Sequence, residues 1–275
     1  EEASLIKGIK IYGVDSLKEI MDFINEKIYL QQIEINKKYI NRKNNYNLDF
    51  RDVKGQENVK RALEIAAAGG HNFMLIGAPG TGKTMLAKRL PSILPDPTFE
   101  ELLEITKIHS IAGLVNNEII NKRPFRIPHH TISSTALVGG GKNPKPGEIS
   151  LAHYGVLFLD EFPEFRKSTL ESLRTPLEDK EIIINRLQAN VKYPCNFMLG
   201  ISLNPCACGY YGTNKCKCSK ESVQRYLAKI SGPLLDRIDI QVLVENIDYK
   251  KLIKNNKEET SEQIRKRVNK VRNIQ

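Results

Sequence analysis

A glycine-rich turn between an apolar run and a helical pattern carries the clearest chemistry in this sequence. Residues 75–86 read LIGAPGTGKTML, and the central eight match the P-loop pattern at every position. Glycines let successive backbone N–H groups converge on an anion, and the start of a helix adds partial positive charge. Lys83 is expected to reach the β- and γ-phosphates of a nucleoside triphosphate, and Thr84 to bind Mg²⁺. The predicted phosphate-binding residues are Gly77, Ala78, Pro79, Gly80, Thr81, Gly82, Lys83 and Thr84.

A second apolar run ends in two carboxylates, in the stretch GVLFLDEF at residues 155–162. Asp160 is predicted to hold Mg²⁺ through water, and Glu161 to polarise the attacking water. An acidic pair after a strand is common on exposed surfaces, but beside a P-loop it favours hydrolysis. A guanine-reading switch GTPase would need an Asn-Lys-x-Asp stretch, which this sequence lacks. ATP is therefore the expected nucleotide.

Two further residues complete a hydrolytic set. Asn204 closes the run FMLGISLN, where its amide is predicted to orient the water. Arg237 lies in GPLLDRIDI at the start of the last strand, where it is expected to reach a neighbouring subunit's γ-phosphate as an arginine finger. The alternative for Arg237 is a structural pairing with Asp236 or Asp239. A finger acting between subunits would require a ring.

Four of the five cysteines fall within the stretch CACGYYGTNKCKC. Two close pairs in an intracellular chain favour tetrahedral Zn²⁺ over disulfides, although the pairs are Cys-x-Cys and not the commoner Cys-x-x-Cys. Reduced free thiols and a redox switch are the alternatives. The stretch begins two residues after Asn204, so we expect it to brace the site. The candidate ligands are Cys206, Cys208, Cys216 and Cys218, whereas Cys195 is predicted to be a buried apolar residue.

The elements that must position these residues alternate between apolar runs and helical patterns from about residue 49 to 246. Such alternation is typical of a mostly parallel sheet with crossover helices, and continuous apolar runs suit strands buried on both faces. The predicted strands are NFMLIGA, GVLFLDE, NFMLGISLN and IQVLVE. Before them we expect a short strand at residues 4–13 and a helix at 15–27 that begins at Asp15 or Ser16. The tail, residues 258–275, is predicted to be a charged amphipathic helix.

The charge balance is basic, with 42 Lys and Arg against 32 Asp and Glu and a net charge of +10. This favours a polyanionic partner, nucleic acid before acidic protein or membrane, although much of the excess is lysine in Asn-rich stretches. No stretch of 18 apolar residues is present, and no signal peptide is recognisable. We expect a piece of a longer cytoplasmic protein that has no membrane partner.

Two stretches concentrate this charge. Residues 181–194 alternate well enough to predict a hairpin, and residues 121–147 form a basic, glycine-rich loop. Either stretch could contact a DNA backbone, and the alternative for the loop is an ordinary solvated insertion. His129 and His130 are adjacent and receive no catalytic role. The candidate DNA contacts are Lys122, Arg123, Arg126, Lys142, Lys145, Arg186 and Lys192.

The P-loop, LFLDE, SLN and GPLLDRID in this order resemble the AAA+ ATPases. The stretch KPGEISLAHYGVLFLDEFPEF narrows the resemblance to the branch that holds magnesium-chelatase motor subunits and MCM helicases. RPFRIPHHTIS, NPCACGYYG and YLAKISGPLLDRIDI narrow it again, to the ComM/YifB magnesium-chelatase-like proteins. The resemblance covers residues 1 to 275, and its motifs are specific.

This resemblance implies an α/β AAA+ P-loop fold, a three-layer parallel sheet with a helix-2-type and a pre-sensor hairpin insertion. It implies a Lon-like remnant at residues 1–32, a linker at 33–48, the ATPase core at 49–248 and the start of a helical lid at 249–275, most of which is missing. It also places the second hairpin in the channel of a ring. The implied function is that of a homo-hexameric ATPase linked to DNA branch migration during natural transformation. A motor that inserts magnesium into a porphyrin, and a module that remodels proteins, remain the alternatives.

Overall fold

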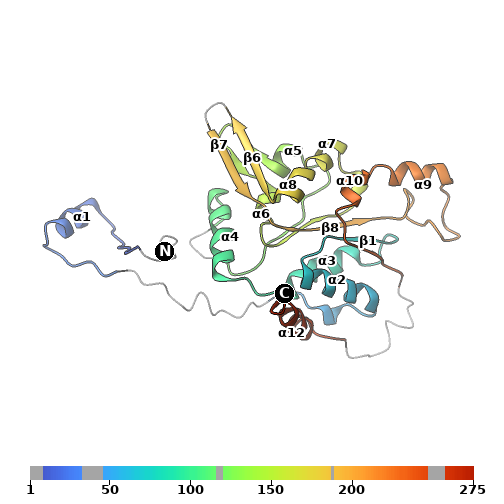
Figure 1. Ribbon diagram of the computed structural model, residues 1–275, viewed down its shortest axis with the longest axis horizontal. Helices are drawn as coiled ribbons and strands as arrows, with labels where there is room; N and C mark the ends of the chain where they lie inside the picture. The colour runs from blue at the N-terminus through green and yellow to red at the C-terminus, as the bar shows by residue number, and fades with distance from the viewer. Residues whose placement is uncertain (1–8, 33–45, 116–119, 187–188, 247–257) are drawn as a thin grey trace.

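A computed structural model describes residues 9–32, 46–115, 120–186, 189–246 and 258–275 (Figure 1). Five sequence expectations fall partly outside these residues. They are the first eight residues of the Lon-like remnant, the beginning of the strand at 4–13, most of the linker, the tip of the second hairpin at 187–188, and the beginning of the lid at 249–257.

A five-stranded parallel sheet forms the centre of the molecule. Its strand order is β2-β5-β8-β1-β9, so β8 lies between the strand that precedes the glycine-rich loop and the strand that ends in the acidic pair. All four predicted strands are confirmed. The strand β2 was not predicted, because two residues are too few to show a pattern. The strands are β1 (Phe73–Ile76), β2 (Phe125–Arg126), β5 (Val156–Leu159), β8 (Met198–Leu203) and β9 (Ile240–Leu243).

Side chains of each strand alternate between two hydrophobic cores, one on each face of the sheet. In β5, Val156 and Phe158 face one core while Leu157 and Leu159 face the other, and all four are fully buried. A strand covered on both faces reads as a continuous apolar run, which is why these strands were recognisable. The predicted three-layer α/β arrangement is confirmed.

Helices cover both faces of the sheet. The first core includes residues of α5 (Ser134–Val138), α6 (Glu148–Leu151), α7 (Lys167–Glu171), α8 (Arg174–Asp179), α10 (Gly232–Leu235) and the 3₁₀ turn η5 (Phe162–Glu164). The second includes residues of α2 (Glu57–Gly69), α3 (Lys83–Arg89), α12 (Ser261–Arg272), η3 (Phe50–Asp52) and η4 (Leu90–Ser92). Two further helices in the described part of the chain are α4 (Phe99–Ile111) and α9 (Lys220–Leu227).

Two β-hairpins interrupt this layered core. One pairs β3 (Gly139–Gly140) with β4 (Lys145–Pro146), and the other pairs β6 (Glu181–Arg186) with β7 (Ala189–Pro194). The Tyr193 hydroxyl donates a hydrogen bond to the Pro144 carbonyl at 2.9 Å, so the hairpins are in contact. One hairpin precedes β5 and the other precedes β8, which confirms both predicted insertions.

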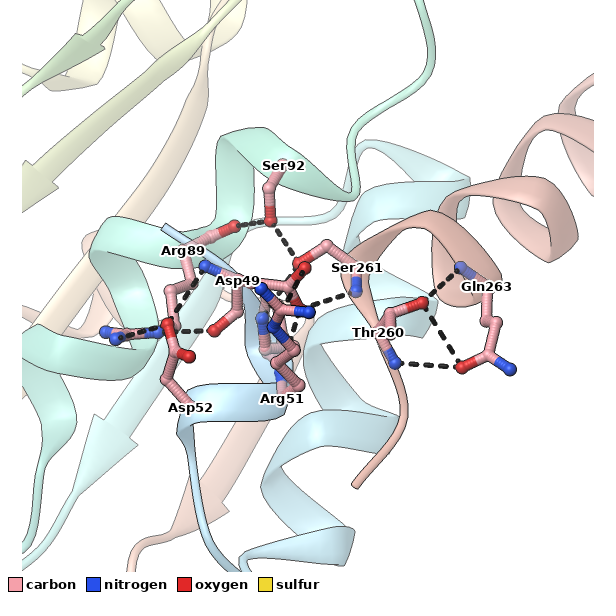
Figure 2. A network of polar contacts seen from close by, with 9 residues as sticks. Asp49, Arg51, Asp52, Arg89, Ser92, Thr260, Ser261 and Gln263 are labelled. Carbon is pink, nitrogen blue, oxygen red and sulfur yellow. Dashed lines mark hydrogen bonds and ion pairs between the residues drawn. The ribbon is translucent and has the colours of Figure 1, made fainter. Parts of the chain in front are cut away.

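The C-terminal helix α12 packs against α2 and is held at its first turn by a polar network (Figure 2). The buried Ser261 hydroxyl accepts hydrogen bonds from the Phe50 backbone N–H and the Ser92 hydroxyl, at 2.8 and 2.7 Å. Arg89, the last residue of α3, donates to the Asp49 carbonyl at 2.7 Å, and the Asp49 carboxylate accepts from the Ser261 N–H. Since α3 begins at Lys83, the network fixes the far end of the helix that follows the glycine-rich loop.

The N-terminal segment contains α1 (Leu17–Ile24), whose cap is Ser16, one of the two predicted capping residues. This helix has no buried residue and lies apart from the sheet in Figure 1. In place of the expected strand, the described residues show a single antiparallel bridge between Tyr12 and Gln32.

Among the described residues, no helix combines the length and apolarity that crossing a lipid bilayer requires.

Candidate functional site

The glycine-rich loop joins the end of β1 to the beginning of α3, as the motif predicted. Gly80 and Gly82 have φ values of +79° and +89°, a region that residues with a Cβ rarely adopt. Gly82 is the N-cap of α3, so the positive end of this helix faces the loop. The Lys83 ammonium donates hydrogen bonds to the carbonyl oxygens of Gly77 and Ala78, at 2.7 and 3.0 Å. The loop is thus folded around its own lysine.

Asp160 lies beside Thr84, although 76 residues separate them in the sequence. The Thr84 hydroxyl donates to one Asp160 oxygen at 2.6 Å, and the Ser202 hydroxyl donates to the other. A hydroxyl and a carboxylate at this spacing are hard oxygen ligands of the kind that Mg²⁺ takes, so the residues fit the expected ion. Ser202 was not predicted, because nothing in the strand pattern distinguishes it from its neighbours.

Lys83 and Asn204 are joined at the centre of the site. The ammonium donates to the Asn204 side-chain oxygen at 3.1 Å, which ties the end of β8 to the glycine-rich loop. Burial lowers the pKa of Lys83, and the nearby carboxylates of Asp160 and Glu161 oppose that shift. A partly desolvated cation between two carboxylates and a row of backbone dipoles is suited to a polyphosphate.

Glu161 is directed outward by an unusual backbone. Its φ is +54°, in the left-handed region, and its N–H donates to Asp160 at 3.2 Å. The carboxylate side chain is 61% exposed and lies 3.7 Å from the His130 ring nitrogen. The two adjacent carboxylates therefore point in different directions. Asp160 accepts hydrogen bonds from the Thr84 and Ser202 hydroxyls, whereas Glu161 is exposed at the mouth of the site. His130 is a further neighbour that the sequence reading left without a role.

These side chains surround a pocket of about 450 Å³. Its lining combines the glycine-rich loop and the start of α3, the acidic pair and the end of β8. The residues are Pro79, Gly80, Gly82, Lys83, Thr84, Met85, Asp160, Glu161, Ser202, Leu203 and Asn204.

Arg237 lies at the opposite ends of the strands. Its carbonyl accepts a hydrogen bond at 2.8 Å from the side chain of Asn72, the residue just before β1. The glycine-rich loop begins at Gly77, five residue steps from Asn72 along β1, or about 16 Å. This distance is greater than the length of an arginine side chain. The guanidinium, 28% exposed, forms an ion pair with Glu178 at the end of α8. Neither of the two expected aspartate partners makes this contact.

The four clustered cysteines converge, with all four sulfur atoms within 4.8 Å of one another. The sulfur atoms are separated by 3.3 Å for Cys206–Cys208, 3.7 Å for Cys208–Cys216 and 3.9 Å for Cys206–Cys216. Four sulfurs bound to one tetrahedral Zn²⁺ would lie about 3.8 Å apart, whereas a disulfide measures about 2 Å. Backbone N–H groups of Tyr210 and Lys217 lower the pKa of Cys208 to about 6, whereas burial and the neighbouring thiols raise the pKa of Cys216 to about 11. The fit to zinc is therefore carried by the sulfur geometry.

Cys195 behaves as predicted and belongs to the core. It is fully buried, and this burial raises its pKa to about 12.

Three of the basic residues expected to contact DNA already have partners within the fold. Arg123 is 11% exposed and donates to Glu101, Pro95 and Tyr154, and Arg126 forms a two-point ion pair with Glu148 at 2.6 and 2.7 Å. The Lys122 ammonium lies over the ring of Tyr46 at 5.4 Å from its centroid. Guanidiniums that already bind carboxylates brace the fold and are poorly placed to meet phosphate.

The lysines of the two hairpins, unlike the two arginines above, are largely exposed to solvent. Lys142 and Lys145 are exposed on the β3–β4 hairpin, and Lys192 is 64% exposed while pairing with Glu181. Arg186 ends β6, and its side chain lies outside the described part of the structure.

Comparison with known proteins identifies relatives along the whole chain. A family model described as "Magnesium chelatase, subunit ChlI" matches residues 49–252. Competence protein ComM of Haemophilus influenzae is 45% identical over 100% of this chain and 55% of its own length. The uncharacterized protein YifB of Escherichia coli is 54% identical over 70% of this chain and 38% of its own. The uncharacterized protein Rv2897c of Mycobacterium tuberculosis is 43% identical over 97% and 53%. The chain thus spans about half the length of these relatives.

Among solved structures, NtrX from Brucella abortus in complex with ATP is similar, with a TM-score of 0.46 and 18% identity. The likeness covers 70% of this chain and 38% of that one.

Proposed function

We propose that this chain, which belongs to the magnesium chelatase subunit ChlI family and is of the ComM/YifB type, is the ATP-hydrolysing core of a ring-shaped motor that acts on DNA. The observation that carries the ATPase part is the convergence of Lys83, Thr84, Asp160 and Asn204 from three neighbouring strand ends. These four residues were expected from three separate motifs, and together they line one pocket.

The residues of this pocket divide the work of hydrolysis. The loop N–H groups and Lys83 bind the phosphates, and a Mg²⁺ ion held by Thr84 and Asp160 would neutralise their charge. The carboxylate of Glu161 accepts a proton from the attacking water as the water oxygen bonds to the γ-phosphorus. The bond between the γ-phosphorus and the bridging oxygen breaks at the same time, and ADP leaves with that oxygen. Asn204 orients the water through its amide. When ATP enters, its phosphates replace the carbonyl oxygens that Lys83 contacts.

The neighbouring subunit is proposed to supply the last cation. Arg237 is too far from its own glycine-rich loop, so its guanidinium serves a phosphate only on an adjacent copy. The pairing with Glu178 keeps the guanidinium oriented until that copy is present. Such an arrangement gives hydrolysis only in an assembled ring, for which a hexamer is the proposed size.

DNA is proposed as the substrate of the motor, contacted by the two joined hairpins. Lys142, Lys145 and Lys192 are exposed there, and their charges suit a phosphate backbone. The ATPase rate is expected to rise when single-stranded or forked DNA is added. Stimulation by a denatured protein but not by DNA would instead support a protein-remodelling function.

Replacing both Lys142 and Lys145 with alanine is expected to weaken DNA binding about tenfold or more. The slope of the logarithm of the binding constant against the logarithm of the salt concentration should become shallower by about one to two, as expected for the loss of one or two phosphate contacts. Fluorescence anisotropy with labelled single-stranded DNA at several salt concentrations would measure both effects. The matched control replaces Lys266 and Lys270, two exposed lysines of α12. This helix lies away from the β6–β7 hairpin in Figure 1. Equal losses in the two variants would mean that overall charge, and not the hairpin, binds DNA.

We also propose that the four clustered cysteines hold one structural Zn²⁺ per chain. Elemental analysis of the purified protein is expected to find about one zinc per chain, and the Cys216→Ser variant to lose most of it. Cys195→Ser is the control, because Cys195 is buried away from the cluster and should leave the zinc content unchanged. Wild-type protein without zinc after growth in zinc-supplemented medium would contradict this site.

A further inference from the structure

The loop that carries the cysteines touches the glycine-rich loop at one point. Gly209 has a φ of +85°, and a Cβ built on it would lie 2.6 and 2.8 Å from Cδ and Cγ of Pro79. The same Cβ would lie 3.8 Å from the Asn204 side chain. Only a glycine allows this approach. Pro79 belongs to the phosphate-binding loop, so the contact joins the cysteine cluster to the nucleotide pocket.

Secondary structure does little to hold the cysteine loop in place. Residues 205–219 contain turns and bends but no helix or strand. The Gly209 N–H donates to the Cys206 carbonyl at 2.9 Å, which closes a turn around Cys208. Gly209 is therefore positioned by the two cysteines of the first pair, and a bound metal would fix both of them.

The cysteine loop also leads from one part of the site to another. It starts after Asn204, which lines the nucleotide pocket, and ends at α9, where Tyr226 is buried. The loop is thus supported on the nucleotide side by Pro79 and on the outer side by the cysteine cluster.

We propose that the zinc centre positions the phosphate-binding loop, so that the affinity of the protein for ATP depends on bound metal. With zinc present, Gly209 stays against Pro79 and Asn204 stays on Lys83. Without zinc, residues 205–219 lose the bonds that order them, the contact with Pro79 loosens, and the loop N–H groups no longer converge on the phosphates. The inference rests on the ATP site and the zinc site proposed above.

The contact can be tested by adding the missing Cβ. Gly209→Ala is expected to weaken ATP binding about tenfold while the zinc content stays at one per chain. Gly212→Ala is a matched control in the same loop, because Gly212 has the same φ of +85° but nothing within 4 Å of its Cβ position. It carries the same backbone strain without touching the P-loop, and its effect should stay within about twofold. Isothermal titration with ATP and Mg²⁺, on Glu161→Gln protein to prevent turnover, measures both.

A double variant identifies the partner atoms. Pro79→Ala removes Cγ and Cδ, the two atoms that the new Cβ would meet. In the Pro79→Ala background, Gly209→Ala is expected to change ATP affinity by less than about twofold. An unrelieved tenfold loss would show that the substitution acts by another route and would overturn the proposed contact.

Zinc removal provides the second measurement. Cys216→Ser protein is expected to bind ATP about tenfold more weakly than wild type while its circular dichroism spectrum is retained. Equal ATP affinity with and without zinc, or equal effects of Gly209→Ala and Gly212→Ala, would overturn the coupling. Wild-type protein that contains zinc but does not bind ATP would instead contradict the proposed function.

Discussion

Replacing Glu161 with glutamine is expected to slow ATP hydrolysis by about 10²–10³-fold while ATP binding is retained. The carboxylate is directed to the mouth of the pocket, apart from the hydroxyls that hold Asp160, so its loss removes a proton acceptor and no phosphate contact. The amide keeps the size of the side chain and leaves the left-handed backbone unchanged. Phosphate release and isothermal titration with ATP measure the two quantities.

Glu164→Gln is the control for this variant. Glu164 follows Glu161 by three residues, is about half exposed and pairs with Lys229 at 3.6 Å. Exposed pairs contribute little, so hydrolysis should stay within about twofold of wild type. A Glu161→Gln protein with undiminished turnover would mean that another group, with His130 the nearest candidate, activates the water.

Replacing Arg237 with alanine is expected to lower the rate of hydrolysis by about 10³-fold and to leave ATP affinity nearly unchanged. An arginine finger acts on charge that develops in the transition state, so removing it affects turnover far more than binding. The same phosphate-release assay, under conditions where the protein assembles, checks this outcome.

Glu178→Ala separates this role from a structural one. Glu178 is the ion-pair partner of Arg237 and is about half exposed. If Arg237 acted only through that ion pair, removing either partner would lower the rate of ATP hydrolysis by the same factor. The finger role predicts that Glu178→Ala stays within about threefold of wild type. Matching losses in the two variants would assign Arg237 to the fold.

The arrangement of the proposed nucleotide site could be predicted from the sequence because local chemistry dictates it. A loop that wraps an anion needs glycine at positions with positive φ, and a strand buried on both faces needs a continuous apolar run. These demands place Lys83, Asp160 and Asn204 at strand ends before any contact is known. Parallel strand order then brings the ends together.

The partners of the basic residues could not be predicted in the same way. Charge counting grouped Arg123 with Lys142, but Arg123 is bound by Glu101, which lies 22 residues earlier on α4. Arg237 pairs with Glu178, 59 residues away, in place of either adjacent aspartate. Such ion pairs depend on how the helices pack against one another, and the periodicity of the sequence does not reveal this packing. The two-residue strand β2 was not predicted for a similar reason, because its pairing with β5 depends on tertiary structure and two residues show no pattern.

The central claim is that an adjacent copy's Arg237 completes each ATP site, and mixing two inactive variants tests it directly. Lys83→Ala removes the phosphate contact and Arg237→Ala removes the proposed finger. If the finger acts between subunits, a random equimolar mixture should regain about a quarter of the wild-type rate, because that fraction of interfaces pairs an intact loop with an intact arginine. A mixture that co-assembles but stays as inactive as its components would contradict the account.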